Sequence, residues 1–191
     1  ALLLFFSILV FFRFRWLLLP LLLIPVFLYV FIPPLQDRVN NSFQDSPDSS
    51  VAWRKNLWKD TIQTTIGNQR FLFGYGMNTF PMVSESLRGI ARGSNDPHND
   101  FVKFFVEGGI VGLGVYIFYL FMIHIRLWKE FIKQSTSETS RLASLILFAF
   151  AISLTFASLS DNIFKNTPVQ WVFWITLGAA TSVFVQRKAG T

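Results

Sequence analysis

Two side chains in a long polar stretch are suited to chemistry: a histidine, His98, and an arginine, Arg54. An imidazole can act as a general base because its ordinary pKa lies near neutral pH. A guanidinium can bind phosphate oxygens through paired hydrogen bonds. The structural alternative for Arg54 is stacking on Trp58 or binding to a lipid phosphate.

The sequence around His98 predicts the start of a helix. Asp96 is a good N-cap and Pro97 suits the first helical position, so we expect a helix to begin here and to continue into an apolar span. His98 would then lie in the first turn, where the positive helix end disfavours an additional proton on the imidazole. A neutral ring able to accept a proton is the expected state. The alternative is that His98 packs over Phe101 and Phe105.

Acidic residues surround His98, but they do not predict a metal site. Helix capping accounts for Asp96. Asp100, Lys103 and Glu107 follow at i, i+3, i+7 spacing with alternating charge, for which we expect ion pairs along the helix. We expect neither a metal nor a cofactor.

Other polar residues are candidates for contacts with a phosphate or a sugar. The substrate-binding candidates are Arg70, Arg88, Arg92 and Asn99. The alternative for each arginine is a solvated charge. A short turn between the last two apolar segments, on the membrane face expected for His98, holds Asp161, Asn162, Lys165 and Asn166. They either line an acceptor cleft or complete a turn.

The elements that position these residues are predicted to be membrane-spanning helices. Hydrophobic residues make up 52% of the chain, and 23 are Phe, which is more than a soluble core of 191 residues would hold. A span needs roughly 20 apolar residues. We predict an all-α integral membrane protein of about four to five transmembrane helices, of which the first is truncated, so that the chain is expected to be a fragment. The candidate segments are 2–12, 17–32, 104–125, 142–159 and 169–185.

The distribution of charge predicts the orientation. Eight Lys and Arg residues flank alternate spans together with Glu130 and Glu138, so that 8 − 2 accounts for the whole net charge of +6. The positive-inside rule makes their side cytoplasmic. The intervening stretch 33–107 has eight cations and eight anions and is expected to face outward. The charge therefore does not indicate a nucleic-acid partner. The eight cations are Arg13, Arg15, Arg126, Lys129, Lys133, Arg141, Arg187 and Lys188.

The chain is thus divided into spans at 1–32, an outer (periplasmic) loop at 33–103 holding the candidate site, and three spans with a basic loop at 104–191. Pro33-Pro34 should end the second span. Within the loop, Ser49 or Ser50 is expected to cap an amphipathic interfacial helix that continues to Ile66 and stops at Gly67. Its apolar stripe is predicted to hold Val51, Trp58, Ile62 and Ile66.

Glycines mark two further features. Residues 70–80 (RFLFGYGMNTF) are predicted to form an extended segment and a tight turn, in which Gly74 and Gly76 let the backbone approach another surface. A potassium-filter interpretation of Gly74-Tyr75-Gly76 lacks the preceding Thr-Val and a pore helix. The four glycines at 108, 109, 112 and 114 are expected to allow close helix packing in the bilayer.

The order and spacing of these motifs resemble the O-antigen ligase and O-antigen polymerase family of bacterial membrane glycosyltransferases. The resemblance lies in Arg54 and Trp58, LFGYGMNTF at 72–80, PHNDF at 97–101 and EGGIVGL at 107–113, within residues 53–121. It implies transfer of a glycan from an undecaprenyl-diphosphate carrier to a hydroxyl of lipid A core, a growing glycan or a protein, on the outer face of the cytoplasmic membrane. Ligase, polymerase and protein O-glycosylation activities all stay open.

The resemblance also implies roles for the two residues. His98 would activate the acceptor hydroxyl and Arg54 would hold the diphosphate, in a metal-independent reaction that inverts the anomeric carbon. A second diphosphate-binding Arg of the family lies in an earlier outer loop, outside this sequence. The expected partners are the lipid-linked glycan donor, the acceptor and the lipid bilayer.

The main alternative is a membrane transporter or accessory protein, for example one related to inorganic-carbon uptake, that carries the same domain. Transporters place ionisable residues within their spans. Segments 142–159 and 169–185 contain no Asp, Glu, Lys or Arg, whereas the residues suited to chemistry lie outside the spans. This distribution favours an enzyme.

Overall fold

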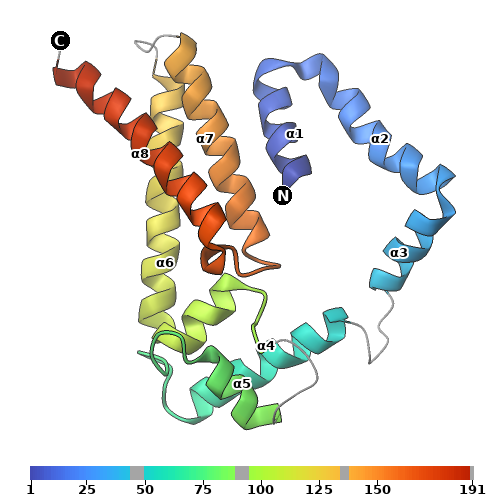
Figure 1. Ribbon diagram of the computed structural model, residues 1–191, viewed down its shortest axis with the longest axis vertical. Helices are drawn as coiled ribbons and strands as arrows, with labels where there is room; N and C mark the ends of the chain where they lie inside the picture. Colours follow the sequence, from blue (N-terminus) through green and yellow to red (C-terminus); the bar gives the residue numbers. More distant parts are fainter. Residues whose placement is uncertain (44–49, 89–94, 134–137, 190–191) are drawn as a thin grey trace.

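The computed structural model describes residues 1–43, 50–88, 95–133 and 138–189, and everything regular within those ranges is helical. The all-α prediction is therefore confirmed for the described part of the chain. The α-helices are α1 (Leu2–Arg13), α2 (Leu18–Phe31), α3 (Pro33–Phe43), α4 (Ser50–Gly67), α5 (Phe80–Arg88), α6 (Asp100–Ile132), α7 (Glu138–Ala157) and α8 (Thr167–Ala189) (Figure 1).

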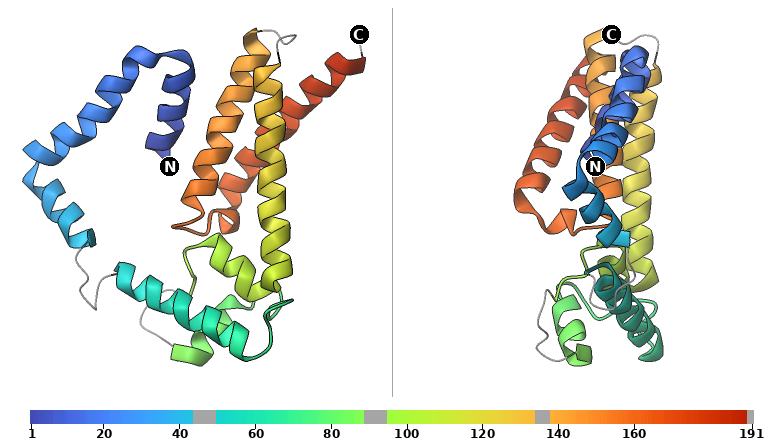
Figure 2. Two further views of the ribbon diagram at one scale, coloured as in Figure 1. Left: turned by 180° about the vertical axis from the view of Figure 1, so that it is seen from behind. Right: turned by 90° about the vertical axis from the view of Figure 1, so that its right-hand side faces the viewer.

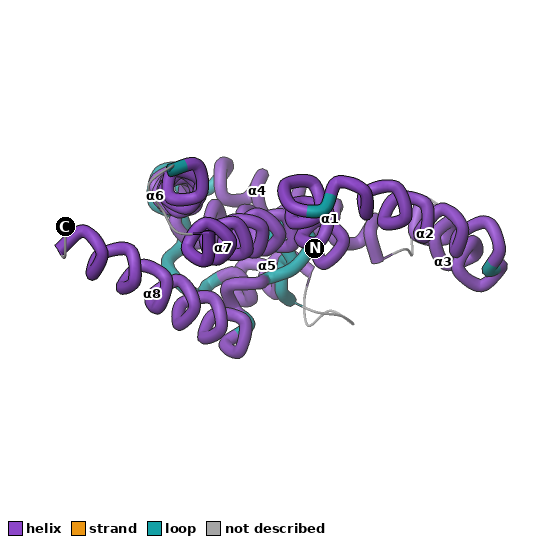
Figure 3. Tube along the Cα trace, turned by 90° about the horizontal axis from the view of Figure 1, so that it is seen from above, coloured by secondary structure: helices purple, strands orange, loops and turns teal. Residues whose placement is uncertain are grey.

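Helices α6, α7 and α8 form a bundle, and α1 packs on the other side of α7. Viewed from above, α7 lies between α1 and the pair α6 and α8 (Figure 3). Apolar side chains hold the bundle together, because its buried cluster contains Leu127, Leu147 and Phe173 from three different helices. Helices α2 and α3 lean away from the bundle (Figures 1 and 2).

Two described helices are long and apolar enough to cross a membrane, α6 and the 140–157 stretch of α7. They correspond to the predicted spans 104–125 and 142–159. A third span is present if 15–31 and 33–40, which meet at a bend of 96°, are counted together. That bend confirms that the chain changes direction at Pro33-Pro34. Helix α1 is shorter than a full span, and the side chains of α8 from residue 179 lie outside the described set.

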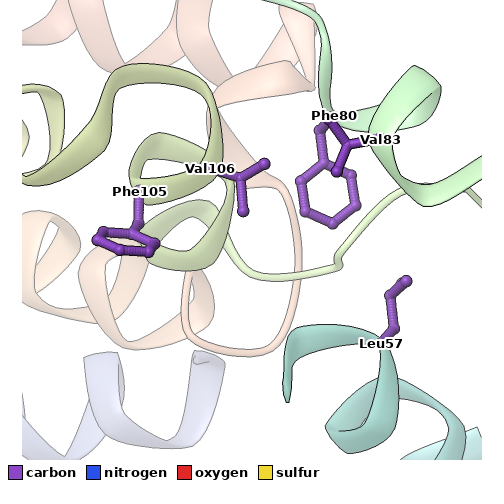
Figure 4. Packing of buried hydrophobic residues seen from close by; sticks show 5 residues of the cluster. All are labelled: Leu57, Phe80, Val83, Phe105 and Val106. Carbon is purple, nitrogen blue, oxygen red and sulfur yellow. The ribbon is translucent and has the colours of Figure 1, made fainter. Parts of the chain in front are cut away.

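The region predicted to face outward, called the outer region below, consists of α4, α5 and the described loops at 68–79 and 95–99. It lies at one end of the bundle, where α4 runs across the end of α6 (Figures 1 and 2). Its own core, shown in Figure 4, brings together apolar side chains of α4, α5 and the first turns of α6. These side chains are Leu57, Phe80, Val83, Phe105 and Val106. Helix α5 was not predicted from the sequence.

Helix α4 has the predicted bounds, but its buried face differs from the predicted stripe. The most buried residues are Leu57, Thr61 and Thr65. Each threonine hydroxyl donates to the carbonyl four residues earlier, Thr61 to Leu57 O at 2.8 Å and Thr65 to Thr61 O at 2.7 Å, so burial leaves no hydroxyl unsatisfied. Val51 and Ile66 are exposed. Leu57 and the two threonines thus lie against the core, with Trp53 and Ile62 partly buried beside them.

Helix α6 is broken at Gly109, whose φ of 64° and ψ of −164° are accessible essentially to glycine alone. An unbroken helix would bond Ile110 N to Val106 O and Val111 N to Glu107 O. The loop 71–76 inserts into both of these gaps and satisfies all four groups. The hydrogen bonds are Tyr75 N to Val106 O at 3.0 Å, Gly76 N to Glu107 O at 2.8 Å, Ile110 N to Phe71 O at 2.8 Å and Val111 N to Leu72 O at 3.3 Å.

Glycine permits this backbone contact on both sides. A Cβ at Gly74 would lie 2.4 Å from Glu107 C, and one at Gly109 would lie 2.3 Å from Leu72 C. The close-approach prediction for Gly74 is thus confirmed. Of the four α6 glycines, Gly109 contacts the loop instead of another helix, a Cβ at Gly112 would lie 3.4 Å from Phe104 O, and Gly108 and Gly114 have open space around their Cβ positions. Helix packing at the glycines other than Gly109 stays a prediction.

Candidate functional site

The turn that carries His98 is fixed by Asn99, which is the true N-cap of α6. The Asn99 side chain accepts a hydrogen bond from Val102 N at 3.1 Å, and the helix begins at Asp100. The prediction that Asp96 caps the helix is therefore wrong. His98 precedes the cap, with a φ of 48°, instead of lying in the first turn. The capping position moves because Asn99 has the extended backbone that an N-cap requires.

Two elements hold this turn from opposite sides. From α4, Trp58 Nε1 donates to Pro97 O at 2.6 Å. The second element is the turn between α7 and α8, residues 158–166, called the α7–α8 turn. In it, Leu159 O accepts from Asn99 Nδ2 at 3.0 Å, and Asn162 Oδ1 accepts from Asn99 N at 3.1 Å. Buried backbone groups beside His98 are thereby paired, which makes the histidine's position well defined.

The carboxylates that follow on α6 also serve this junction. Asp100 is buried, and its Oδ2 accepts from Phe164 N at 3.2 Å. Glu107 is buried as well and accepts from Phe80 N at 3.2 Å, where α5 begins. The predicted ion pairs of these residues with Lys103 are absent from the described structure. Both carboxylates instead satisfy backbone N–H groups of other elements, which a pattern confined to one helix does not reveal.

His98 contacts Asp161 of the α7–α8 turn. Its Nδ1 lies 3.1 Å from Asp161 Oδ1, and the histidine side chain is 28% exposed. Partial burial opposes ionisation of Asp161, but the hydrogen bonds from His98 and from Asn162 N, with the positive charge of Arg54, outweigh it and lower the pKa of Asp161. The carboxylate is therefore charged at neutral pH and can orient the imidazole.

Arg54 reaches the same turn from α4. Its Nη1 donates to Ser160 O at 3.2 Å, next to Asp161. One of five guanidinium N–H donors is used in this bond, which leaves others for a ligand. The structure thus brings Arg54 and His98 to one turn, although 44 positions separate them in the sequence (98 − 54).

The other predicted site residues have different surroundings. Arg88 pairs with Asp60 at 2.7 Å and its guanidinium carbon lies 5.8 Å from the Trp53 ring centroid. Arg70 is exposed in the turn after α4. Asn99 uses its side chain in the junction described above. Arg92 lies outside the described residues. Their binding roles stay predictions.

An ion pair forms a further boundary of the site. Lys165 Nζ lies 2.6 Å from Asp96 Oδ2, and so connects the α7–α8 turn to the loop before His98. In the described ranges no three His, Cys, Asp or Glu side chains are grouped so as to hold a metal ion. The arrangement brings together an imidazole, a carboxylate and a guanidinium.

An apolar groove of about 410 Å³ adjoins the site between α6 and α7. It extends from Phe101 and Leu159, which neighbour the site in sequence, to His124 and Thr155 deeper in the bundle. His124 Nδ1 lies 2.6 Å from Leu120 O of its own helix. The groove is large enough and apolar enough for part of an alkyl or isoprenoid chain.

Sequence reasoning found Arg54 and His98 but not the partner of His98. Asp161 was placed on the expected face of the membrane, as part of either a cleft or a completed turn. The sequence indicated only the shared side of the membrane, because the two predicted spans between His98 and Asp161 return the chain to the side on which it started. Only the fold selects Asp161 among the polar residues of the turn.

The family model described as O-antigen ligase matches residues 1–117. The match includes α4, the 71–76 loop, His98 and the first half of α6, and ends before the turn that holds Asp161. None of the curated proteins and none of the solved structures matches the chain.

Proposed function

The chain belongs to the O-antigen ligase family of polysaccharide biosynthesis, and on that premise we propose that it transfers a glycan from an undecaprenyl-diphosphate carrier to an acceptor hydroxyl on the outer face of the bacterial inner membrane. The observation that carries the proposal is the convergence of His98, Asp161 and Arg54 on the α7–α8 turn. The acceptor is a glycolipid, a growing glycan or a protein.

His98 is proposed as the general base. With Asp161 accepting from Nδ1–H, the imidazole presents Nε2 to the acceptor, and Nε2 takes the hydroxyl proton as the oxygen attacks the anomeric carbon. The new bond joins that oxygen to the anomeric carbon, while the bond to the diphosphate breaks and its electron pair leaves with the diphosphate. Attack opposite the leaving group inverts the anomeric configuration. No step in this scheme uses a metal.

Arg54 is proposed to stabilise the departing diphosphate. Negative charge increases on the leaving group in the transition state, and charge-assisted hydrogen bonds from a guanidinium strengthen with it. The hydrogen bond of Arg54 to Ser160 O holds the side chain beside His98 without occupying its remaining donors. Arginine suits this role better than lysine because its planar fork binds two oxygens at once.

A lipid-linked donor is supported by the groove between α6 and α7. Its lining is almost wholly apolar, and it begins beside the residues proposed for the chemistry. A diphosphate held at Arg54 would leave the first isoprene units at the mouth of this groove. A water-soluble nucleotide sugar would have no use for such a surface.

The outer-face assignment is supported by the two ends of α6. His98 precedes its first residue, and Arg126 and Lys129 lie near its last turns. A helix that spans the membrane separates those ends, and the positive-inside rule assigns the basic end to the cytoplasm. Labelling of a cysteine introduced at His98 from outside intact cells tests this orientation.

The test of the function is a His98→Ala variant of the full protein, assayed with lipid-linked glycan and acceptor. Loss of a general base is expected to lower turnover by about 10²- to 10⁴-fold. Lipid-linked donor should accumulate in cells. Gln63→Ala is the control, and it should retain near-normal turnover because Gln63 is an exposed side chain of α4 outside the groove. Normal transfer by His98→Ala would refute the proposed base.

Arg54→Lys separates the second role from the first. The single ammonium keeps the charge but loses paired hydrogen bonding, so turnover should fall by about tenfold or more, the loss of at least one charge-assisted bond. Lys55→Ala, which removes the neighbouring exposed cation, is the control. Equal activity of Arg54→Lys and the unsubstituted protein would reassign Arg54 to packing.

A further inference from the structure

The loop between α4 and α5 presents an unusual group of exposed apolar side chains, Leu72, Phe73 and Met77. Their exposed fractions are 55%, 72% and 69%. Large apolar side chains that project together from the polar part of a protein mark a contact surface. The question is which surface they meet.

These side chains project from a rigid support. The backbone of residues 71–76 bonds to both sides of the α6 break, and Gly74 lies directly on the Glu107 backbone. The ring of Phe71 packs edge-on against the buried Phe105, with centroids 6.0 Å apart. The projection of Leu72 and Phe73 is therefore a fixed feature of the fold.

The support also fixes the height of the loop along α6. Its hydrogen bonds end on Ile110 and Val111, the first residues after the break, and residues 110–125 contain no Asp, Glu, Lys or Arg. Ile110 and Val111 are themselves 41% and 47% exposed. The exposed face of the loop is thus continuous with the apolar face of the span at the level where that span begins.

A cation stands beside the apolar group. Arg70 is exposed and directly precedes Phe71, and the polar residues Asn68 and Gln69 come before it. Aromatic and aliphatic residues next to an arginine are typical of segments that lie at a lipid headgroup boundary. Lipid phosphates attract such a cation, whereas a purely apolar protein partner would not.

We propose that Leu72, Phe73 and Met77 insert into the outer leaflet of the phospholipid bilayer, with Arg70 at the level of the lipid phosphates. The loop is then a second membrane anchor of the outer region, besides the span of α6. It prevents the outer region from tilting about the break, and so holds the turn with His98 at a constant height above the lipid. The inference rests on membrane insertion of α6 and, for the choice of leaflet, on the proposed outer-face orientation; it does not depend on the proposed reaction.

The absence of cysteine from the chain allows a direct test by spin labelling. Nitroxide labels are placed singly at Phe73→Cys and Met77→Cys in the full protein, reconstituted in vesicles of phosphatidylethanolamine and phosphatidylglycerol. Collision rates are measured with oxygen, which concentrates in the bilayer, and with a water-soluble nickel chelate. Phe118→Cys is the lipid control, because the Phe118 side chain on the span is 63% exposed. Gln63→Cys, at an exposed position of α4, is the water control.

Labels at 73 and 77 are expected to give an oxygen-to-nickel ratio several-fold above that of the water control and below that of the lipid control, because Phe118 lies deeper in the span than the loop. A ratio equal to that of Gln63→Cys would overturn the proposal, because the loop would then face water. Low access to both reagents would overturn it as well, because a protein segment or a second copy would then cover the loop. Adding Leu72→Ser to the Met77→Cys variant should shift its label toward water; an unchanged ratio would count against insertion.

Discussion

The bundle and the outer region are held together by different interactions. In the bundle, the buried cluster is made of apolar side chains such as Leu127, Leu147 and Phe173. In the outer region, a small apolar core is surrounded by buried polar groups that bond across elements, including Asn99, Asp100 and Glu107. The difference follows from the solvent, because lipid tolerates an apolar helix surface that water would not.

The comparison shows which region fixes the positions of its side chains most precisely. Apolar packing alone allows helices to shift with little penalty, whereas hydrogen bonds between buried groups require particular distances and directions. The two histidines show the contrast. His98 lies in the hydrogen-bonded region beside a carboxylate, and His124 lies in the bundle with its Nδ1 against the carbonyl of its own helix. Only the first has the surroundings of a catalytic base.

The largest effect is expected at the junction of the two regions. Gly109→Ala should lower the free energy of unfolding by at least about 3 kcal/mol, because its backbone conformation excludes a side chain and its Cβ would overlap Leu72. Gly108→Ala, one residue earlier with open space, should be neutral or stabilise by about 0.5–1 kcal/mol. SDS titration of the purified variants measures both. Equal stabilities would show that the loop does not depend on the break.

A change at Asp161, in the turn between α7 and α8, tests whether the junction with the outer region orients the His98 imidazole as well as stabilising the fold. Asp161→Asn should lower kcat by about tenfold or more, a part of the 10²- to 10⁴-fold that a general base contributes. The lowered pKa of Asp161 means that its pairing with His98 is present above the ordinary carboxyl range and is lost only as the pH falls through the lowered value. The defect should therefore persist across pH 5–8.

Glu138→Gln is the matched control for that experiment. Glu138 pairs with Arg13 at 2.7 Å at the other end of the bundle, and both side chains are well exposed. Exposed pairs contribute little, so the transfer rate should stay close to normal. A similar loss in both variants would show that any carboxylate matters and would remove the special role of Asp161.

Asn99 both caps α6 and donates a hydrogen bond to Leu159 O, and two substitutions separate these functions. Asn99→Ala should destabilise the protein by about 1–2 kcal/mol, the usual loss for an N-cap. Asn99→Asp keeps the acceptor for Val102 N but loses the donor to Leu159 O, so it should lose only about 1 kcal/mol. The free energy of unfolding of Asn99→Asp, compared with that of the unsubstituted protein, gives the contribution of the hydrogen bond from Asn99 Nδ2 to Leu159 O. Full stability of Asn99→Ala would contradict the assigned cap.

The smallest effect is expected within the bundle. Ser153 on α7 is buried, and its hydroxyl has no partner among the described residues. Ser153→Ala should therefore be neutral or stabilise by up to about 1 kcal/mol. Ser158→Ala should destabilise by about 1 kcal/mol, since that hydroxyl bonds Tyr116 and Thr155 O. The reverse order of stabilities would contradict the difference drawn between the two regions.

The sequence predicted those elements whose pattern is local. Apolar stretches located the spans in α6 and α7, Gly67 marked the end of α4, and Gly74 indicated a close backbone approach. Arg54 and His98 were selected because their side chains suit phosphate binding and proton transfer. The roles assigned to them are proposals that the experiments above address.

What the sequence did not predict depends on contacts between distant segments. Asp96 and Asn99 are both good capping residues, and the hydrogen bonds that Asn99 donates to Leu159 O and Asn162 Oδ1 favour the second. Asp100 has the spacing for an ion pair with Lys103, yet a backbone N–H more than sixty positions away takes its carboxylate. Helix α5 follows a glycine-rich turn and begins with Phe80-Pro81, which gave little helical periodicity. No single-segment pattern contains this information.

The break in α6 also sets an order of events during biosynthesis. Residues 71–76 leave the ribosome before residues 106–111, and they provide the partners for the four backbone groups that the break exposes. Within hydrocarbon each such group left unpaired would cost several kcal/mol. The loop must therefore be paired with the break when α6 settles into a bilayer.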